Sequence, residues 1–235
     1  YSRQTTIPGF GNEAQEKLKN ASILVVGAGG LGIPVLLYFV AAGVGKIGIV
    51  ENDTVDISNL QRQILFTEKD VKESKLHKAH SRLEEMNSAT EFVLFEERFS
   101  SENALAIAKE YDLLIDCTDN FPTRYLINDA CFHLKKPCVF ASISQFDGQC
   151  TIFCVEDGPC YRCLYTEPPP AGLMPNCAEG GVLGVLPGIL GSIQAAEVIK
   201  LILGTGDSLV GKLLILDVLG MNFKKLSLRQ NPDCL

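Results

Sequence analysis

A glycine-rich turn between two apolar segments constrains the fold more than any other feature of this sequence. Ile23–Val26 is a continuous apolar run typical of a buried strand, and Ile33–Ala42 has the length and composition of a helix. Between them, Gly27, Gly29 and Gly32 match the pattern G-x-G-x-x-G. Glycines let the backbone approach a phosphate, and the helix N-terminus offers free N–H groups. The turn predicts a nucleotide site, the alternative being a tight strand–helix packing turn.

Strand-like and helix-like segments alternate through the first 141 residues. Further strands are expected at Lys46–Val50, Phe92–Phe95, Leu113–Ile115 and Pro137–Ala141. Helices are expected from Asn12, as a cap, to about Asn20, and at Ser74–Met86, Glu102–Lys109 and Thr123–Leu134. Such alternation predicts a Rossmann-like α/β fold, with a mostly parallel sheet and helices on both of its faces.

The pattern changes after Ser142. Gln149–Val155, Lys212–Leu216 and Phe223–Leu228 resemble strands without crossover helices, which predicts antiparallel strands in the second half. A Pro- and Gly-rich loop, Thr166–Gly181, precedes a helical region of about Val182–Leu203. Because no repeat or linker divides the chain, we expect a single domain over 1–235, with a nucleotide-binding half of about 1–141 and a second half of about 142–235.

Composition excludes two classes of partner. A net charge of −7 without basic clusters argues against nucleic acid, which is bound by gathered Lys and Arg side chains. The uncharged stretches are interrupted by Gly and Pro, so no continuous membrane-spanning segment is expected. The N-terminus shows no secretory pattern, and nine cysteines in such a chain indicate the reducing cytoplasm.

Charged residues after the second expected strand distinguish between nucleotides. Glu51 closes that strand and Asp53 follows, where an acidic side chain can accept hydrogen bonds from a ribose. Arg62, within Ser58–Gln63, and Lys75 then bring cations to the same edge. A triphosphate needs such cations and hydride transfer does not, although isolated Arg and Lys side chains are usually solvated surface charges.

Several motifs in this order resemble the MoeB/ThiF adenylyltransferases, relatives of the adenylating half of ubiquitin-activating enzymes. The resemblance covers nearly the whole chain. It rests on Gly27–Gly32, Ser58–Gln63, Asp116-Cys117-Thr118-Asp119-Asn120, Arg3-Gln4 with Gly9-Phe10, and Cys160-Tyr161-Arg162-Cys163. It implies that ATP adenylates the C-terminal carboxylate of a small ubiquitin-like sulfur carrier, a β-grasp protein ending in Gly-Gly. It also implies a homodimer with shared sites, in which the 182–203 region is core or dimer contact.

The resemblance also assigns roles to residues. Gly30 would lie against the nucleotide, and Glu51 would hold the ribose at a position where many relatives carry Asp. Asp119 would organise Mg²⁺, and Arg3 would reach the triphosphate of the other subunit. The full set of implied nucleotide contacts is Gly27, Gly29, Gly30, Gly32, Glu51, Asp53, Ser58, Asn59, Arg62, Lys75, Asp119 and Asn120. Asn59, Arg62 and Lys75 would contact the phosphates, while Asp116 is interpreted as a strand-end residue that bonds nearby backbone.

The reaction implied by the resemblance requires no general base. A C-terminal carboxylate is already ionised near neutral pH, so its attack on phosphorus depends on positioning and charge stabilisation. Consistently, His77, His80 and His133 fall in expected helices and outside the motifs.

The cysteines divide into a metal site, a candidate nucleophile and packing residues. Cys160 and Cys163 have the spacing of a zinc knuckle, the alternative being a redox dithiol. The resemblance implies a second pair after Asn231-Pro232, of which this chain holds only Cys234, so we expect Zn²⁺ on three cysteines and a fourth ligand outside the chain. Cys177, in the Pro-rich loop, joins the carrier or takes part in sulfur transfer in some relatives; otherwise it is an incidental thiol. The remaining cysteines, Cys117, Cys131, Cys138, Cys150 and Cys154, are expected to be buried.

Three other functions compete with adenylation for sulfur transfer in molybdopterin, thiamine or related biosynthesis. A nicotinamide-dependent oxidoreductase would bind NAD and would leave Arg62, Lys75 and Asp119 unexplained. A nucleotide-binding module without catalysis would never release pyrophosphate. A dehydratase acting on a modified tRNA base, from the same superfamily, is disfavoured by the acidic composition and the zinc cysteines.

Overall fold

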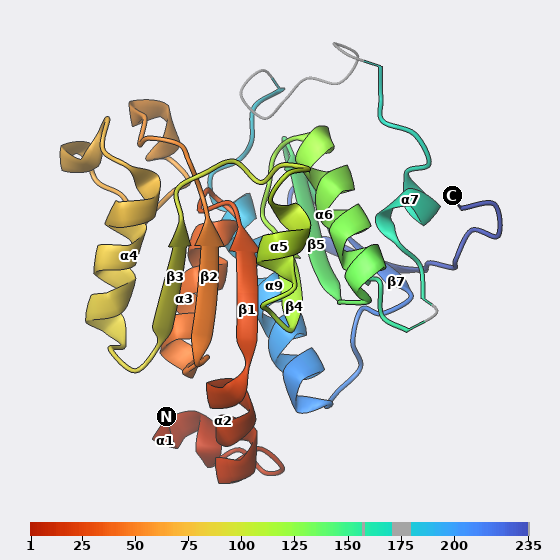
Figure 1. Cartoon of the computed structure of the whole chain (residues 1–235). Coiled ribbons are helices and arrows are strands. Elements are labelled where there is room, and N and C mark those ends of the chain that lie inside the picture. Colours follow the sequence, from red (N-terminus) through yellow and green to blue (C-terminus); the bar gives the residue numbers. More distant parts are fainter. Residues whose placement is uncertain (157, 171–179, 235) are drawn as a thin grey trace.

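The molecule is built around one eight-stranded sheet in the order β3-β2-β1-β4-β5-β6-β7-β8 (Figure 1). The computed structural model describes residues 1–156, 158–170 and 180–234. The strands are β1 Ser22–Val26, β2 Lys46–Val50, β3 Glu91–Phe95, β4 Leu113–Asp116, β5 Cys138–Ser144, β6 Asp147–Phe153, β7 Lys212–Asp217 and β8 Asn222–Ser227. The first five pair in parallel and the last three continue the sheet antiparallel, which confirms the predicted Rossmann-like architecture.

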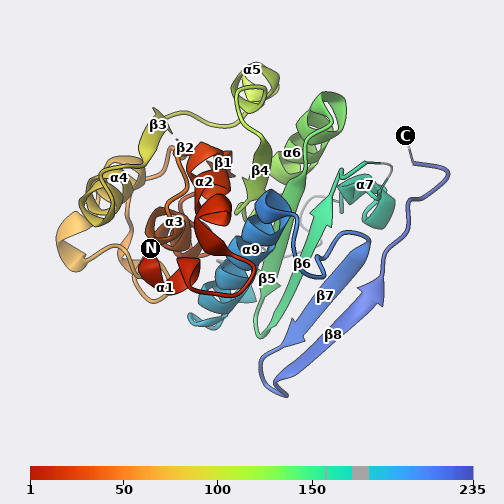
Figure 2. The ribbon, with the colours of Figure 1, turned by 90° about the horizontal axis from the view of Figure 1, so that it is seen from below.

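Helices cover both faces of the sheet. The described α-helices are α1 Ser2–Thr5, α2 Gly11–Asn20, α3 Gly32–Ala42, α4 Lys75–Met86, α5 Ala104–Ala108, α6 Phe121–Leu134, α7 Tyr161–Leu164 and α9 Leu186–Leu203, with 3₁₀ turns η1 Ile57–Asn59 and η2 Glu68–Asp70. In Figure 2, α3, α4 and α9 lie on one face, and α5, α6 and α7 on the other. Each face holds its own apolar core, because successive strand residues point to opposite sides.

Helix α9 passes a length and hydropathy test for a membrane span, the one helix among the described residues that does. Its packing gives it another role. It lies against α3, β5 and β6, and its buried side includes Leu190 and Val198. Fully buried Gln194 donates to backbone carbonyls of the sheet, and buried Glu197 accepts from the Leu209 N–H at 2.8 Å. These contacts make α9 a core helix of the sheet.

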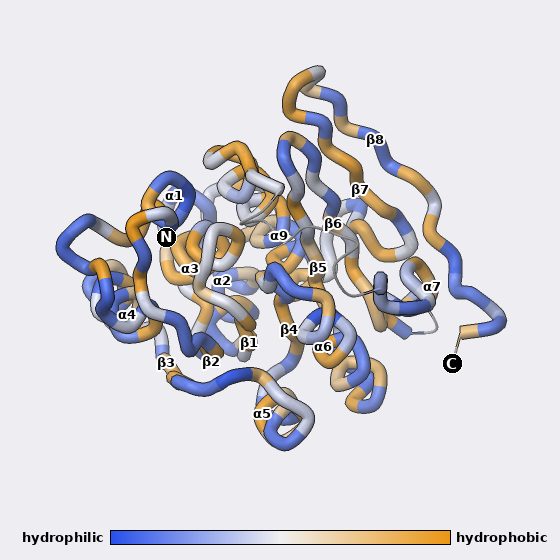
Figure 3. The backbone as a smooth tube through the Cα atoms, turned by 90° about the horizontal axis from the view of Figure 1, so that it is seen from above, coloured by the Kyte–Doolittle hydropathy of each residue, from blue (hydrophilic) through white to orange (hydrophobic). Residues whose placement is uncertain are grey.

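Hydropathy along the chain follows these layers (Figure 3). Helix α3 is almost entirely apolar and most of it is buried, whereas α4 alternates buried and exposed residues because one side faces solvent. The sheet ends at β8, where all six residues are exposed. Burial is greatest in the central strands, whereas β3 at one edge has no buried residue and exposure rises from β6 through β7 to β8 at the other edge.

Some expected helix boundaries were wrong. Asn12 does not cap α2: the Phe10 carbonyl already accepts from the Ala14 N–H, which places Asn12 inside the first turn. The late helix begins at Leu186 rather than near residue 182, with Pro187 in its first turn, where a missing N–H is tolerated. Helix α5 is shorter than expected, Ala104–Ala108.

Candidate functional site

A cavity of about 550 Å³ opens at the carboxyl ends of β1, β2 and β4, where ligands of parallel α/β sheets bind. The predicted nucleotide contacts that line it are Gly27, Gly29, Gly30, Glu51, Asp53, Arg62, Lys75, Asp119 and Asn120. Segments distant in sequence therefore meet in one cavity whose volume suits a ligand of nucleotide size.

The glycine turn is closed so tightly that side chains are excluded from it. Gly27 has φ +97°, and a Cβ atom there would lie 2.9 Å from the Cys117 carbonyl oxygen. A Cβ on Gly32 would lie 2.0 Å from the Gly27 carbonyl oxygen, which explains why Gly32 supports the turn without lining the cavity. The N–H groups of Gly29 and Gly30 find no acceptor among the described residues. They remain available to an anion at the start of α3.

Glu51 is buried at the end of β2 and fixes the turn. Its Oε2 accepts from the Ala28 N–H at 2.9 Å, and its Oε1 accepts from the N–H groups of Asn52 and Asp53, each at 2.9 Å. The carboxylate thus ties β2 to the glycine turn. Its expected contact with a ribose stays a prediction, and only lone pairs left over from these three bonds could serve it.

Two cations reach the cavity from the segment after β2. Lys75, the first residue of α4, is only 6% exposed, and its Nζ lies 3.1 Å from Asp53 Oδ2. Arg62 Nη1 donates to the Ser58 carbonyl at 3.0 Å, which holds the guanidinium at the cavity wall. Both cations are held by contacts within their own segment, as a preformed anion site requires.

The side chains of Ser58 and Asn59 are engaged elsewhere. Asn59 Oδ1 accepts from the Asp56 N–H at 3.1 Å, and Ser58 Oγ donates to Asp56 Oδ1 at 2.6 Å. These bonds form a capped turn around η1, and neither residue is among those lining the cavity. The expected contacts of Ser58 with the nucleotide and of Asn59 with the phosphates stay predictions, and the turn uses only the amide oxygen of Asn59.

The segment after β4 places one carboxylate inside the protein and one in the cavity. Asp116 is buried, and its Oδ1 accepts from the Thr118 N–H at 2.9 Å and from Thr118 Oγ1 at 2.6 Å, the strand-end role expected for it. Burial raises the pKa of the Asp116 carboxyl. Asp119 is exposed and lines the cavity, and Asn120 Oδ1 caps α6 by accepting from the Thr123 N–H at 3.0 Å.

Among the cavity residues that sequence reasoning did not assign, two carry a buried polar atom without a hydrogen-bond partner in the described part of the chain. Gln63 is 3% exposed, and its buried Oε1 has no hydrogen-bond partner. Arg124 is 8% exposed, and its buried Nε is likewise unpartnered. A signal existed for Arg124, because a cation in the first turn of a helix opposes the helix dipole and calls for a nearby anion.

Arg3 lies apart from this cavity. It belongs to α1, which is at the end of the molecule opposite the carboxyl ends of the parallel strands (Figure 1). Arg3 is exposed and does not line the cavity of its own chain. Any contact between Arg3 and a triphosphate must therefore come from a second copy of the chain.

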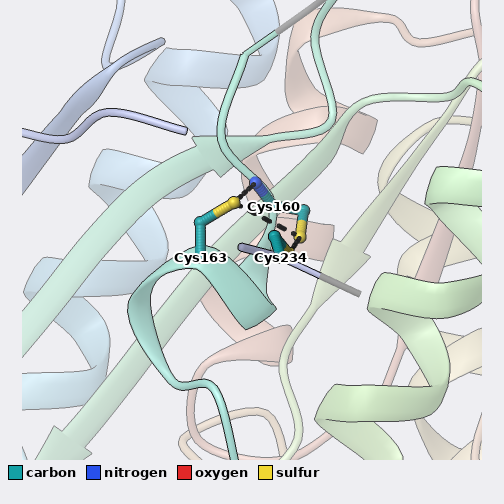
Figure 4. A group of neighbouring side chains, drawn as sticks. All are labelled: Cys160, Cys163 and Cys234. Atoms are coloured by element: carbon teal, nitrogen blue, oxygen red, sulfur yellow. Dashed lines mark hydrogen bonds between the residues drawn. The ribbon is translucent and has the colours of Figure 1, made fainter. Parts of the chain in front are cut away.

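Three predicted zinc ligands converge in the C-terminal half (Figure 4). The sulfur of Cys160 lies 3.7 Å from that of Cys163 and 3.5 Å from that of Cys234, and all three lie within 4.8 Å of one another. Tetrahedral Zn²⁺ with bonds of about 2.3 Å places its sulfur ligands about 3.8 Å apart. The arrangement therefore fits three ligands of a zinc ion.

The knuckle is anchored to α6. Asn128 Oδ1 accepts from the Tyr161 N–H at 2.6 Å, and Arg162 pairs with Asp129 through two bonds of 2.8 and 2.7 Å. The five other described cysteines, Cys117, Cys131, Cys138, Cys150 and Cys154, are buried as predicted, and Cys177 lies outside the described residues. Burial raises the pKa of the Cys150 and Cys154 thiols, which keeps them unreactive.

A family model described as the ThiF family matches residues 1–235. The chain belongs to the ThiF family. It is 54% identical to the sulfur carrier protein adenylyltransferase of Thermus thermophilus, over the whole chain and 88% of that protein. It is 48% identical to the adenylyltransferase and sulfurtransferase MOCS3 of Culex quinquefasciatus, and also to the probable adenylyltransferase/sulfurtransferase MoeZ of Mycobacterium tuberculosis. The match to MOCS3 covers 100% of this chain and 54% of MOCS3. The match to MoeZ covers 99% of this chain and 60% of MoeZ, so the chain spans little more than half the length of these two relatives.

Solved structures support the fold. The MccB protein of E. coli, crystallised with MccA-N7isoASN, matches 94% of this chain and 68% of its own with a TM-score of 0.82 at 22% identity. MccB crystallised with ATP matches the same shares with a TM-score of 0.80 at 23% identity. At this identity the likeness shows a shared architecture for the ThiF-family chain and nothing about its substrate.

Proposed function

We propose that this chain uses ATP to adenylate the C-terminal carboxylate of a small ubiquitin-like sulfur-carrier protein. The observation that carries the proposal is the cavity: the unpaired N–H groups of Gly29 and Gly30 share it with Arg62 and Lys75 and with the Asp119 carboxylate. That combination suits a triphosphate. The names of the ThiF-family relatives, adenylyltransferase in each case, support the same chemistry.

The reaction balances without a general base. One oxygen of the ionised carboxylate attacks the α-phosphorus, the bond from that phosphorus to the bridging oxygen breaks, and pyrophosphate leaves with the electron pair. No proton has to be removed from the nucleophile, in keeping with a cavity that no histidine lines. The glycine-turn N–H groups, Arg62 and Lys75 orient the phosphates and offset the charge that moves to the leaving group.

Metals complete the proposal. Asp119 is an exposed cavity carboxylate suited to Mg²⁺, which would neutralise phosphate charge when bound. Cys160, Cys163 and Cys234 hold Zn²⁺, which connects α7 to the C-terminal segment, and the described residues supply three of the four ligands that structural zinc takes. The zinc is structural in this proposal, because the three sulfurs lie outside the nucleotide cavity.

The partner and assembly follow the same logic. The carrier is a β-grasp protein whose Gly-Gly tail is narrow enough to enter the cavity. Two copies of the chain form a homodimer in which Arg3 of one copy serves the other's triphosphate, because Arg3 cannot serve its own. We place the reaction in the cytoplasm, in sulfur transfer for molybdopterin, thiamine or a related product.

A nicotinamide-dependent oxidoreductase gains no support from the cavity. Buried Lys75 and wall residue Arg62 would have no task in hydride transfer, and they stand beside the turn where a triphosphate would lie. Adenylation uses both.

ATP–pyrophosphate exchange tests the proposal. Purified protein with Mg²⁺ and a panel of Gly-Gly-ended β-grasp carriers should move labelled pyrophosphate into ATP with at least one carrier and with none that lacks its terminal glycine. If no carrier supports exchange, the proposal is wrong. Cys177→Ala should leave exchange intact and stop only a later thiol step; loss of exchange itself would argue against a covalent role for Cys177.

A further inference from the structure

Arg124 is a buried cation without an anion of its own. It lies in the first turn of α6, is 8% exposed and lines the cavity. One nitrogen, Nη2, donates to the Thr118 carbonyl at 3.1 Å, while Nε is buried and has no hydrogen-bond partner in the described part of the chain. Arg124 forms no ion pair with any described residue. The charge of Arg124 acts on buried Asp116, but Asp116 Oδ1 already accepts two hydrogen bonds from Thr118.

Two independent features make this arrangement unfavourable unless an anion binds. Burying an unpaired charge is costly, because water is lost and no counter-charge replaces it. The first turn of α6 also carries the positive end of the helix dipole, which repels a cation there. The guanidinium is nevertheless held in place, 5.5 Å from the Phe121 ring and 5.6 Å from the Phe140 ring. A cation that is fixed, buried and unpaired fits a binding site for an anionic group.

The strand order divides the lining of the cavity into two ends. Along the cavity the strands run β2, β1, β4, β5, so Glu51 and Lys75 lie toward the β2 end. Arg124 lies toward the β4 and β5 end, where the wall also includes Leu126 and Ile143. The expected nucleotide contacts lie at the first end and, through Asp119 and Asn120, in the loop after β4. They do not include Arg124, Leu126 or Ile143, so this part of the lining, part apolar and part cationic, remains for the second substrate.

We propose that Arg124 binds the terminal carboxylate of the incoming carrier tail, an inference that rests on the proposed adenylation. One carboxylate oxygen attacks the α-phosphorus and forms the new P–O bond as pyrophosphate departs. The other oxygen stays hydrogen-bonded to Arg124 and becomes the carbonyl oxygen of the acyl-adenylate. No electron is gained from or lost to another reactant, and no proton moves. Arg124 thereby selects a free carboxylate and holds it in line for attack.

Two variants test the assignment. Arg124→Lys keeps the charge and loses the planar fork, Arg124→Gln loses both, and Arg229→Gln is the control at an exposed arginine outside the cavity. The affinity of an exchange-competent Gly-Gly carrier is measured with Mg²⁺ and α,β-methylene-ATP, which blocks reaction. Carrier affinity should fall at least about tenfold in Arg124→Gln and less in Arg124→Lys. ATP affinity should change less than about twofold, and the control should match the wild type in both.

A chemical change in the carrier provides the second arm. A carrier ending in a carboxamide should bind the wild-type protein at least about tenfold more weakly than the carboxylate form, because the charge-assisted bond is lost. Arg124→Gln should bind the two forms alike. If that variant does not fold, Arg124→Lys gives the same comparison with a reduced ratio.

The inference is overturned if ATP affinity falls with carrier affinity, or if the variants still discriminate between carboxylate and carboxamide as the wild type does. Either result leaves the proposed function standing, since wild-type exchange is measured separately. If the wild type exchanges with no carrier, both proposals fall.

Discussion

The two ends of this sheet are stabilised by different means. At the β1–β2 end the backbone closes on itself: Gly27 and Gly32 leave no room for a side chain, and Glu51 is satisfied by three N–H groups. At the β8 end every strand residue is exposed. The sulfur atoms of Cys160, Cys163 and Cys234 lie within 4.8 Å of one another there, an arrangement that three thiolates could adopt only around a positive charge. The first site is preformed by packing, whereas the second, in the function proposed above, would depend on a metal ion.

Helix α9 brings the C-terminal half to the nucleotide cavity. Near its start, Pro187 would lie 3.2 Å from a Cβ on Gly30, so it packs directly against the glycine turn. Deeper in the core, Gln194 Nε2 donates to the Asp116 carbonyl at 2.9 Å and to the Val139 carbonyl at 3.2 Å, joining β4 to β5 beneath the cavity. The C-terminal half therefore supports the nucleotide site as well as carrying the zinc cysteines.

The largest expected effect comes from filling the closed turn. In Gly32→Ala the new Cβ would lie 2.0 Å from the Gly27 carbonyl oxygen, so the start of α3 must move away from the cavity. We expect a loss of more than about 4 kcal/mol in the free energy of unfolding and no measurable ATP binding. Gly188→Ala is the control, because a Cβ there meets nothing within 4 Å. Calorimetry and ATP titration compare the two, and normal ATP binding by Gly32→Ala would contradict a packing-built site.

Metal removal should affect the opposite end alone. A chain extended past Leu235 is expected to hold one zinc per chain, and chelation should destabilise α7 and the C-terminal segment by several kcal/mol. Hydrogen exchange at residues 158–165 and 228–234 should accelerate, while ATP affinity changes little. Cys160→Ser should lose the zinc, and Cys138→Ser, a buried cysteine outside the cluster, should keep it. Absence of stoichiometric zinc would reject the site.

A change of charge in the nucleotide cavity should alter catalysis without altering the fold. Lys75→Met preserves the apolar stem of a side chain that is 6% exposed and removes the cation beside Asp53. We expect kcat/KM for ATP in pyrophosphate exchange to fall about 100-fold. Lys78→Met, on the same helix but paired with exposed Glu73, should stay within about twofold. Equal losses in both variants would remove Lys75 from the phosphate site.

The features that were predicted correctly are those that local residue patterns determine, namely the strands and the glycine turn. Apolar runs located every strand of the sheet, and Gly27–Gly32 located the cavity, because the spacing of glycines between a strand and a helix has few structural solutions. The family resemblance assigned Asp119 and Asn120, after β4, to the nucleotide, and both line the cavity.

Side-chain orientation required tertiary information. The expected contact of Asn59 with phosphates stays a prediction, and the sequence did not reveal that its amide oxygen accepts from the Asp56 N–H. Arg124 was missed because its burial depends on a ring from β5 and on the Thr118 carbonyl, neither of which a helical pattern reveals. Cys234 meets Cys160 across 74 residues, and only the family resemblance anticipated that contact.

Each half contains an Asp–Arg pair that fixes a site-bearing segment, and these pairs give the smallest expected effects. Arg82 on α4 bonds Asp70 at 2.6 Å and also the Leu65 carbonyl, holding the segment that carries Arg62. Asp129 and Arg162 hold α7 to α6. The Asp70 side chain is 6% exposed and that of Asp129 38%, so loss of the first pair should be more costly.

The pH dependence of unfolding separates the two pairs. Burial alone would raise the pKa of Asp70, but hydrogen bonds from Thr67 and Arg82 outweigh it and hold the pKa below its ordinary value of 3.8. A depressed pKa contributes stability that is present above about pH 4 and is lost as pH falls through the folded-state value. Asp70→Asn should therefore lose about 1–3 kcal/mol at pH 7, and the difference from wild type should shrink below pH 4.

Asp129→Asn should lower the free energy of unfolding by at most about 1 kcal/mol at pH 7, because the pair is partly exposed. The pKa of Asp129 is lowered too: burial opposes the shift, and the hydrogen bonds from Arg162 outweigh it. Urea unfolding at pH 7 and pH 3 measures both variants. Equal losses would show that exposure does not distinguish the two halves. If only Asp70→Asn loses stability, the difference in packing between the two ends of the sheet extends beyond the glycine turn. It then includes the segment that carries Arg62, whose buried ion pair contributes to stability where the exposed pair does not.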